Sequence, residues 1–357
     1  MRYATLLAKS ARALVLPFIL AHCASLLSER LPPGRRLMRQ GLGVLAALLA
    51  AGVIQAVPSG ALAQQRETIS FESRHRGKPI QLSAEIHWPV GQGTVAAMVI
   101  HHGSGGWSAL REGRFAREMV AMGVAGVVID SFKARDIIST WADQSQVSRL
   151  DFIVDALRAL KALGDNPRID PKRIGIMGFS KGCLSALYSA QERFVELAGV
   201  PAGLRFALHV PFYPLCLVYS YKPTTSGAPI YMLIGGHDTW VGAEPCTSYA
   251  EVLRANGARV EAKVYARAMH QFDGGPTNYA RRAENPSKCR YEEQSDGSFI
   301  ERTSGLAVAG ANGWPDEAGT AWNTCRTWGA GYGYQQEAAE QSLADLKSYG
   351  RRHLLGI

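Results

Sequence analysis

Short, continuously apolar segments alternate with amphipathic segments through most of the chain. Residues 95–100, 124–129, 174–177, 206–210, 230–234 and 260–265 form apolar runs of the kind found in parallel strands covered on both faces. Between them, apolar residues recur at helical spacing, as at Phe115, Met119 and Met122. The alternation predicts a doubly wound, mostly parallel α/β sheet, whose ligand site lies beyond the carboxyl ends of the strands.

The pattern changes at both ends of this region. Residues 68–87 contain two alternating stretches around a polar turn, which predicts an N-terminal antiparallel hairpin. After His270 comes a long segment rich in glycine, asparagine and charge, and then a predicted helix at about 336–355. Because a structureless loop of that length is improbable in a compact domain, we expect an ordered excursion at about 273–334, with a strand near 298–302, that forms one wall of the site.

The first 63 residues resemble a leader rather than folded protein. A charged start at Met38, an apolar run at 41–57 and the sequence Ala61-Leu62-Ala63 follow the order of a secretory signal peptide, with cleavage expected after Ala63. Met38 is then the expected start of translation. A membrane anchor is the rival interpretation, but neither apolar run of the leader is a clean bilayer span. Residues 64–357 are expected to form a single domain.

The net charge of the chain is much lower without the leader. The leader holds seven Lys/Arg and one Glu, so the remaining chain has 32 basic and 29 acidic residues, a balance of +3 compared with +9 for the whole chain. The basic charge therefore belongs mainly to targeting, and we expect no nucleic-acid partner. After cleavage we also expect no stable membrane partner, and a periplasmic or secreted protein.

One serine lies in a context that makes it a candidate nucleophile. Ser180 is the centre of Gly178-Phe179-Ser180-Lys181-Gly182, between a predicted strand and a predicted helix. This G-x-S-x-G turn is typical of α/β hydrolases, because only small residues fit beside so sharp a turn. A chance match in a glycine-rich chain is the alternative, and the strand–turn–helix context argues against it.

A serine nucleophile needs a base, and the base needs a carboxylate that orients it. In α/β hydrolases the acid and then the histidine follow the serine along the chain. Asp238 and His270 each lie just beyond the carboxyl end of a predicted strand, so we predict Asp238 as the acid and His270 as the base. The rivals are His237, which comes too early for the base, and Asp273 and Glu244, which follow their strands less directly.

Two backbone N–H groups must then face the oxyanion that develops on the substrate. Lys181, directly after the serine, is expected to supply one of them. The other is expected from the loop His101-His102-Gly103-Ser104-Gly105-Gly106, in which Ser104 is the preferred donor and Gly105 the next. Such a mechanism requires no metal and no organic cofactor.

Five segments together resemble the dienelactone hydrolase family of α/β hydrolases, in a secreted branch. They are HHGSGG at 101–106, VVIDSF at 127–132, GFSKGC at 178–183, GGHDTW at 235–240 and AMHQFD at 268–273. The resemblance implies the α/β-hydrolase fold and the hydrolysis of small esters or lactones. The family's namesake enzymes carry a cysteine nucleophile where this chain has Ser180, which favours a broader esterase-like activity over dienelactone itself.

The cysteines beyond the leader are five, an odd number, in a chain expected to be exported. Cys216 and Cys246 follow adjacent predicted strands and are expected to pair, which would tether the loop of Asp238. Cys289 and Cys325 would close the excursion. Cys183 is expected to remain a free thiol that faces the core. Five buried thiols are the alternative.

Aromatic and basic residues near these loops are candidates for the substrate pocket: Trp107, Phe132, Arg135, Trp141, Phe179 and Trp240. Trp107 and Trp240 rank first because each closely follows a predicted site loop, and Arg135 is a candidate partner for a substrate carboxylate.

The predicted function is a serine hydrolase that acts on small-molecule esters or lactones through an acyl-enzyme. One alternative is a serine peptidase of the prolyl-oligopeptidase type, which the short region before the hairpin disfavours. The other is a non-catalytic binding protein of the same fold.

Overall fold

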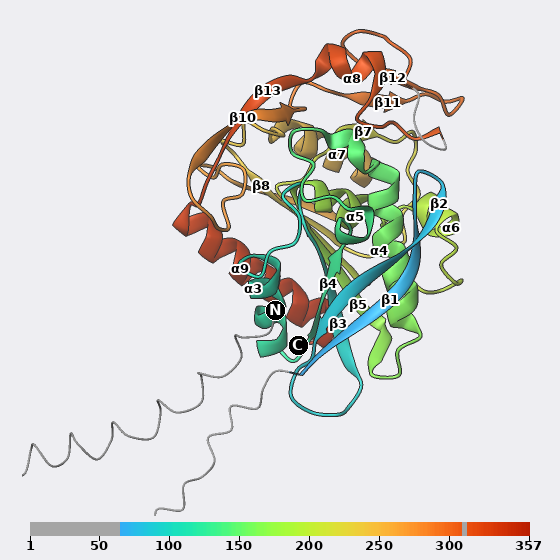
Figure 1. Cartoon of the computed structure of the whole chain (residues 1–357), viewed down its shortest axis with the longest axis vertical. Helices are drawn as coiled ribbons and strands as arrows, with labels where there is room; N and C mark the ends of the chain where they lie inside the picture. Colours follow the sequence, from blue (N-terminus) through green and yellow to red (C-terminus); the bar gives the residue numbers. More distant parts are fainter. Residues whose placement is uncertain (1–64, 309–312) are drawn as a thin grey trace, which may run out of the picture. The chain divides into compact units, whose positions relative to one another are not determined.

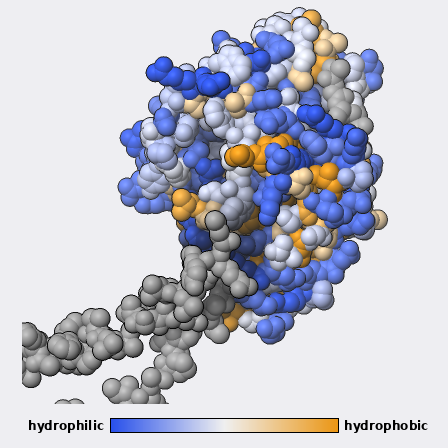
Figure 2. Space-filling model, in the orientation of Figure 1, coloured by the Kyte–Doolittle hydropathy of each residue, from blue (hydrophilic) through white to orange (hydrophobic). Residues whose placement is uncertain are grey.

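The computed structural model describes residues 65–308 and 313–357. The predicted leader, with its start at Met38 and its cleavage site after Ala63, lies outside these residues. In the described part of the chain, no helix is both long enough and apolar enough to span a bilayer. The face drawn in Figure 2 is mainly hydrophilic, with hydrophobic residues in small groups.

The fold is built on an eight-stranded sheet with the strand order β1-β2-β4-β3-β5-β6-β8-β9. Its strands are β1 (Arg66–His75), β2 (Lys78–His87), β3 (Val95–His101), β4 (Ala125–Asp130), β5 (Ile169–Phe179), β6 (Leu208–Phe212), β8 (Ile230–Gly235) and β9 (Val260–Tyr265). β1 and β2 form the predicted antiparallel hairpin, β2 pairs antiparallel with β4, and the remaining pairs are parallel. The predicted α/β-hydrolase fold is confirmed.

Helices cover both faces of this sheet (Figure 1). One face carries α4 (Arg149–Gly164), α5 (Cys183–Tyr188), α6 (Glu192–Leu197) and α7 (Glu244–Ala255), and the other carries α3 (Glu112–Ala121) and α9 (Gln336–Gly350), which ends in the π-helical turn Arg351–Leu355. Because successive strand residues point to opposite faces, Val99 packs in one buried cluster while Met98 and Ile100 pack in the other. This two-sided burial explains why the strands are continuously apolar.

The segment after His270, for which the sequence predicts an excursion, contains one helix and four strands in its described residues. Its elements are β10 (Asn278–Asn285), β11 (Tyr291–Glu293), β12 (Phe299–Glu301), α8 (Gly319–Cys325) and β13 (Thr327–Tyr332). β10 pairs with β13, and a second small sheet has the order β12-β11-β7, where β7 is Val218–Tyr219. Figure 1 shows this region, in orange and red, at one end of the main sheet.

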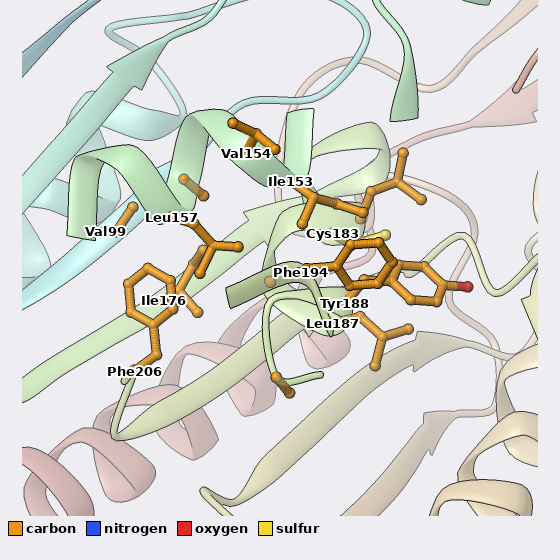
Figure 3. Packing of buried hydrophobic residues seen from close by; sticks show 14 of the residues in the cluster. Val99, Ile153, Val154, Leu157, Ile176, Cys183, Leu187, Tyr188, Phe194 and Phe206 are labelled. Carbon is orange, nitrogen blue, oxygen red and sulfur yellow. The ribbon is translucent and has the colours of Figure 1, made fainter. Parts of the chain in front are cut away.

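Both predicted disulfides are present. Cys216 is bonded to Cys246, which ties the chain after β6 to the start of α7, and Cys289 is bonded to Cys325 within the excursion. Cys183 is the free, buried thiol of the described residues. Figure 3 shows it among the apolar side chains of the core. Burial raises the pKa of the Cys183 thiol well above its usual range, so the thiol stays protonated and unreactive.

Candidate active site

The chain turns sharply at Ser180, between β5 and α5. Ser180 begins the 3₁₀ turn Ser180–Gly182 and has a φ of 52°, in the left-handed region that few non-glycine residues occupy. A Cβ added to Gly178 would collide with the carbonyl group of Gly182, and one added to Gly182 would collide with the carbonyl oxygen of His101. The two glycines of the motif are therefore required by close backbone approach, and they let the serine side chain emerge above the sheet edge.

Ser180, His270 and Asp238 lie in one chain of hydrogen bonds. His270 Nε2 is 2.9 Å from Ser180 Oγ, and His270 Nδ1 is 2.7 Å from Asp238 Oδ2. The other carboxylate oxygen of Asp238 accepts from the backbone N–H groups of Trp240 and Val241 at 2.9 and 3.0 Å. A carboxylate held in this way fixes Nδ1 as the protonated nitrogen and leaves Nε2 free to accept the serine proton.

Aromatic rings and the excursion hold the His270 loop in place. The rings of Trp240 and Tyr213 lie 4.9 and 4.8 Å from the imidazole, measured between ring centroids. The N–H of Gly333, just beyond β13, donates to the His270 carbonyl oxygen at 2.9 Å. The Tyr213 hydroxyl donates to Asp273 Oδ1 at 2.8 Å. Burial, together with the neighbouring Asp273 carboxylate, raises the pKa of Tyr213 well above its usual range, so this hydroxyl remains a donor.

None of the three rival residues is hydrogen-bonded to Ser180 or His270. His237 is exposed on the loop between β8 and α7. The Asp273 carboxylate accepts from Tyr213, and Glu244 forms a largely exposed ion pair with Arg290 at 3.3 Å.

The two expected oxyanion donors belong to segments that meet at the nucleophile. A Cβ added to Gly103 would lie 3.0 Å from the carbonyl oxygen of Phe179 and 3.3 Å from Cβ of Ser180, so the glycine loop packs directly against the turn. Ser104 and Gly105 line the same cavity as Ser180. The Lys181 side chain runs inward, is almost fully buried, and its burial lowers the pKa of the ammonium group.

The Ser180 hydroxyl and His270 open into a cavity of about 450 Å³. Its other lining residues are Gly103, Ser104, Gly105, Arg111, Trp141, Tyr213, Trp240, Gln271, Pro276, Asn278, Tyr279, Ala280 and Tyr332. Aromatic side chains make up much of this wall, and two of them, Tyr279 and Tyr332, come from β10 and β13. The excursion thus forms one side of the cavity, where the sequence predicted it.

Two predicted pocket residues lie elsewhere, while Trp240 and Trp141 line the cavity. Trp107 follows Gly106, which has a φ of 81°, and lies beside Glu85 and Lys133 rather than in the cavity. The Arg135 guanidinium is fully buried against the Asp155 carboxylate at 2.8 Å and is unavailable to a substrate. Neither Trp107 nor Arg135 lines the cavity of Ser180. Phe132 and Phe179 belong to the core.

Sequence reasoning missed Tyr213, Arg111 and Tyr279. Tyr213 directly follows β6, so the strand-end rule that selected Asp238 and His270 could have selected it as well. Arg111 comes just before α3 and lies 3.8 Å from the Asp273 carboxylate, a contact between distant segments that no local pattern indicates. Tyr279 lies on β10, whose position depends on the fold of the excursion.

Among residues 65–308 and 313–357, no group of three or more His, Cys, Asp or Glu side chains is arranged to hold a metal ion.

Comparisons with known proteins add a family and a fold. The sequence model described as the dienelactone hydrolase family matches residues 94–294. A search of curated proteins finds no match. The solved structure named m3DLH is 17% identical with a TM-score of 0.51, over 82% of this chain and 99% of that chain. The likeness to m3DLH is one of fold.

Two further solved structures are similar over part of the chain. A dienelactone hydrolase-like promiscuous phosphotriesterase from metagenomic libraries is 16% identical with a TM-score of 0.46, over 81% of this chain and 98% of that one. A propionate-bound esterase from the Planctomycetes species Thermogutta terrifontis is 18% identical with a TM-score of 0.45, over 57% of this chain and 85% of that one.

Proposed function

Because this chain belongs to the dienelactone hydrolase family it is a hydrolase, and we propose that it cleaves ester or lactone bonds of small acyl substrates with Ser180 as the nucleophile. The observation that carries the proposal is the chain of hydrogen bonds from Asp238 through His270 to Ser180, at 2.7 and 2.9 Å. These distances are within the range over which a base can take a proton directly.

In the proposed mechanism, His270 Nε2 takes the Ser180 proton while Oγ attacks the substrate carbonyl carbon. The Asp238 carboxylate stabilises the imidazolium that forms, and the N–H groups of Lys181 and Ser104 bind the oxyanion. The tetrahedral intermediate collapses, the C–O bond breaks, and the leaving alkoxide takes the proton from His270. Water then attacks the acyl-enzyme by the same steps and releases the acid and free Ser180.

The cavity supports small substrates. Its volume of about 450 Å³ falls within the usual range for small-molecule sites. The aromatic walls favour an apolar or planar acyl group, while Ser180 and His270 lie where the scissile carbonyl must be placed.

We further propose that the mature protein works in the periplasm or outside the cell. The two disulfides of the described residues support an oxidising compartment, where such bonds persist. The predicted signal peptide has the matching order of charged start, apolar run and small-residue cleavage site.

Replacing the nucleophile tests the proposal. Ser180→Ala is expected to lower the hydrolysis of p-nitrophenyl acetate by about a thousandfold or more, with an unchanged circular dichroism spectrum and melting temperature. Cys183→Ser is the matched control, because it removes the buried thiol next to this turn and should keep the wild-type rate. Retained activity in Ser180→Ala would refute the assignment of the nucleophile.

The same protein preparation separates the remaining alternatives. An ester and an amide of the same acid are compared as substrates, and faster cleavage of the amide would favour a peptidase. A fluorophosphonate probe should label wild type but not Ser180→Ala. A wild-type protein that the probe does not label would favour a non-catalytic binding protein.

A further inference from the structure

Gln144 lies where three segments of the site meet. It is buried at the start of the 3₁₀ turn Gln144–Gln146, which precedes α4. Its side chain, its carbonyl oxygen and its N–H group each make a hydrogen bond to a different segment. These segments are the loop of Ser104, the turn of Ser180 and the excursion.

The side chain of Gln144 holds the Ser104 loop. The Ser104 hydroxyl donates to Gln144 Oε1 at 3.1 Å, and Gln144 Nε2 lies 3.1 Å from the same hydroxyl oxygen. The same Oε1 accepts from the Thr140 hydroxyl at 3.2 Å, and the Thr140 N–H donates to the Ser104 carbonyl oxygen at 2.7 Å. Ser104 is thus fixed through both its side chain and its backbone.

The carbonyl oxygen of Gln144 holds the turn after the nucleophile. It accepts from Lys181 Nζ at 2.7 Å, and the ammonium group also lies 5.6 Å from the centre of the Phe152 ring. The Lys181 side chain is therefore anchored at its far end. This anchor restrains the orientation of Lys181. The backbone N–H of Lys181 is one of the two proposed oxyanion donors.

The N–H group of Gln144 is held by Glu284 on β10. Glu284 Oε2 accepts from it at 2.7 Å, and Glu284 Oε1 accepts from Trp322 Nε1 at 3.1 Å. The Glu284 carbonyl oxygen accepts from the indole N–H of Trp240 at 2.9 Å. The excursion is thereby linked to the oxyanion side of the site through Gln144 and to the acid–base side through Trp240.

We propose that Gln144 is a positioning residue that sets both oxyanion donors, Ser104 and Lys181, and that Glu284 anchors it to the excursion. The inference rests on the proposed function. Oxyanion donors bind the charge that develops in the transition state and bind the ground-state carbonyl weakly. A misplaced donor should therefore lower kcat and leave KM nearly unchanged.

The test compares Gln144→Leu with Gln146→Leu in the full chain. Gln146 lies on the same turn, and its amide donates to the carbonyl oxygens of Ser139 and Asp143, away from Ser104. Gln144→Leu is expected to lower kcat on p-nitrophenyl acetate by about tenfold to a hundredfold, with KM within about twofold of wild type. Gln146→Leu should match wild type in both constants.

A transition-state analogue supplies a readout that a general loss of packing would not reproduce. The Ki of butylboronic acid should rise in Gln144→Leu by the same factor by which kcat/KM falls. The pH midpoint of kcat/KM should stay unchanged, because Asp238 and His270 keep their contacts. If Gln144→Leu does not fold, Glu284→Gln is used instead, since it keeps the shape of the side chain but removes one acceptor oxygen, and it should lower kcat at constant KM.

The possible outcomes separate the two proposals. An inactive wild type would overturn the proposed function. An active wild type in which Gln144→Leu and Glu284→Gln both behave like Gln146→Leu would overturn the role of Gln144 alone. The same conclusion would follow if these variants raised KM and left kcat unchanged.

Discussion

At the residue scale, the geometry of Ser180 depends on neighbours that carry no reactive group. A left-handed φ at a non-glycine residue costs of order 1–3 kcal/mol, so the surrounding chain must hold Ser180 in that conformation. The contact with Gly103 is part of that support, because the glycine loop lies against the peptide that precedes Ser180.

Gly103→Ala should therefore lower activity. Its added methyl group would lie 3.0 Å from the Phe179 carbonyl oxygen, closer than side chains normally approach, so the loop of Ser104 must shift. We expect kcat for an ester to fall by about tenfold or more, since small displacements of catalytic groups have large effects. Gly105→Ala is the comparison, because its methyl would have no atom within 4 Å. Steady-state kinetics measures kcat for both variants. An equal or larger loss of kcat in Gly105→Ala would show that the contact between Gly103 and Phe179 does not support the site.

The residues that sequence reasoning placed well share a local cause. Ser180, Asp238 and His270 each lie in the turn or loop that follows a strand, and the ends of parallel strands converge at one edge of the sheet. Trp107 and Arg135 also follow strands, but their directions depend on the positive φ of Gly106 and on the buried partner Asp155. Neither of these tertiary features can be inferred from the order of residues.

At the element scale, the sequence predicts which segments are strands better than it predicts the residues at which they begin and end. The run at 260–265 coincides with β9, whereas the run at 206–210 corresponds to β6, which begins at Leu208 and ends at Phe212. Phe206 is as buried as the strand that follows it, so hydrophobicity alone does not mark where pairing begins. The two-residue strand β7 was missed because its pairing partner, β11, belongs to the excursion.

The Cys289–Cys325 disulfide should stabilise the excursion and, through it, the site. It closes a loop of 36 residues, for which loop-closure entropy contributes about 4 kcal/mol. A Cys289→Ala/Cys325→Ala double variant is expected to lose about that much free energy of unfolding in urea. It should also lose ester hydrolysis, since β10 and β13 line the cavity and Glu284 lies on β10.

The corresponding Cys216→Ala/Cys246→Ala variant provides the comparison. Its loop of 30 residues predicts a similar loss of stability, but the bond lies outside the excursion. If removing Cys289–Cys325 lowered the free energy of unfolding and left kcat and KM unchanged, the excursion would not shape the site.

At the scale of the whole molecule, burial sets opposing responses to pH. Burial lowers the pKa of His102 and of His209 to about 4, so these imidazoles are neutral when folded. Burial also raises the pKa of Glu112 and of Glu317 to about 7. As pH falls from 7 to 4, the histidines favour the unfolded chain, which binds more protons there, whereas the two carboxyl groups favour the folded one. The change in the free energy of unfolding with pH therefore contains contributions of opposite sign. The contribution of one histidine can be measured by replacing that histidine.

His209 on β6 suits this purpose, because its ring is fully buried and Nδ1 donates to the Ala186 carbonyl oxygen at 2.9 Å. In the unfolded chain it takes up a proton near its usual pKa of 6.5, whereas in the folded protein it does so only near 4. Its contribution to stability is therefore present above pH 6.5 and is lost as pH falls, by about 3 kcal/mol at pH 4.

His209→Asn keeps a donor near Nδ1 but removes this titration. Wild type should be the more stable protein at pH 7, where the variant has lost packing around β6. The difference in free energy of unfolding should then shrink by about 3 kcal/mol as pH is lowered to 4, because the protons taken up by unfolded His209 are absent from the variant. Urea unfolding at several pH values in this interval measures the difference. A gap that stays constant with pH would show that His209 is protonated equally in the folded and unfolded chains.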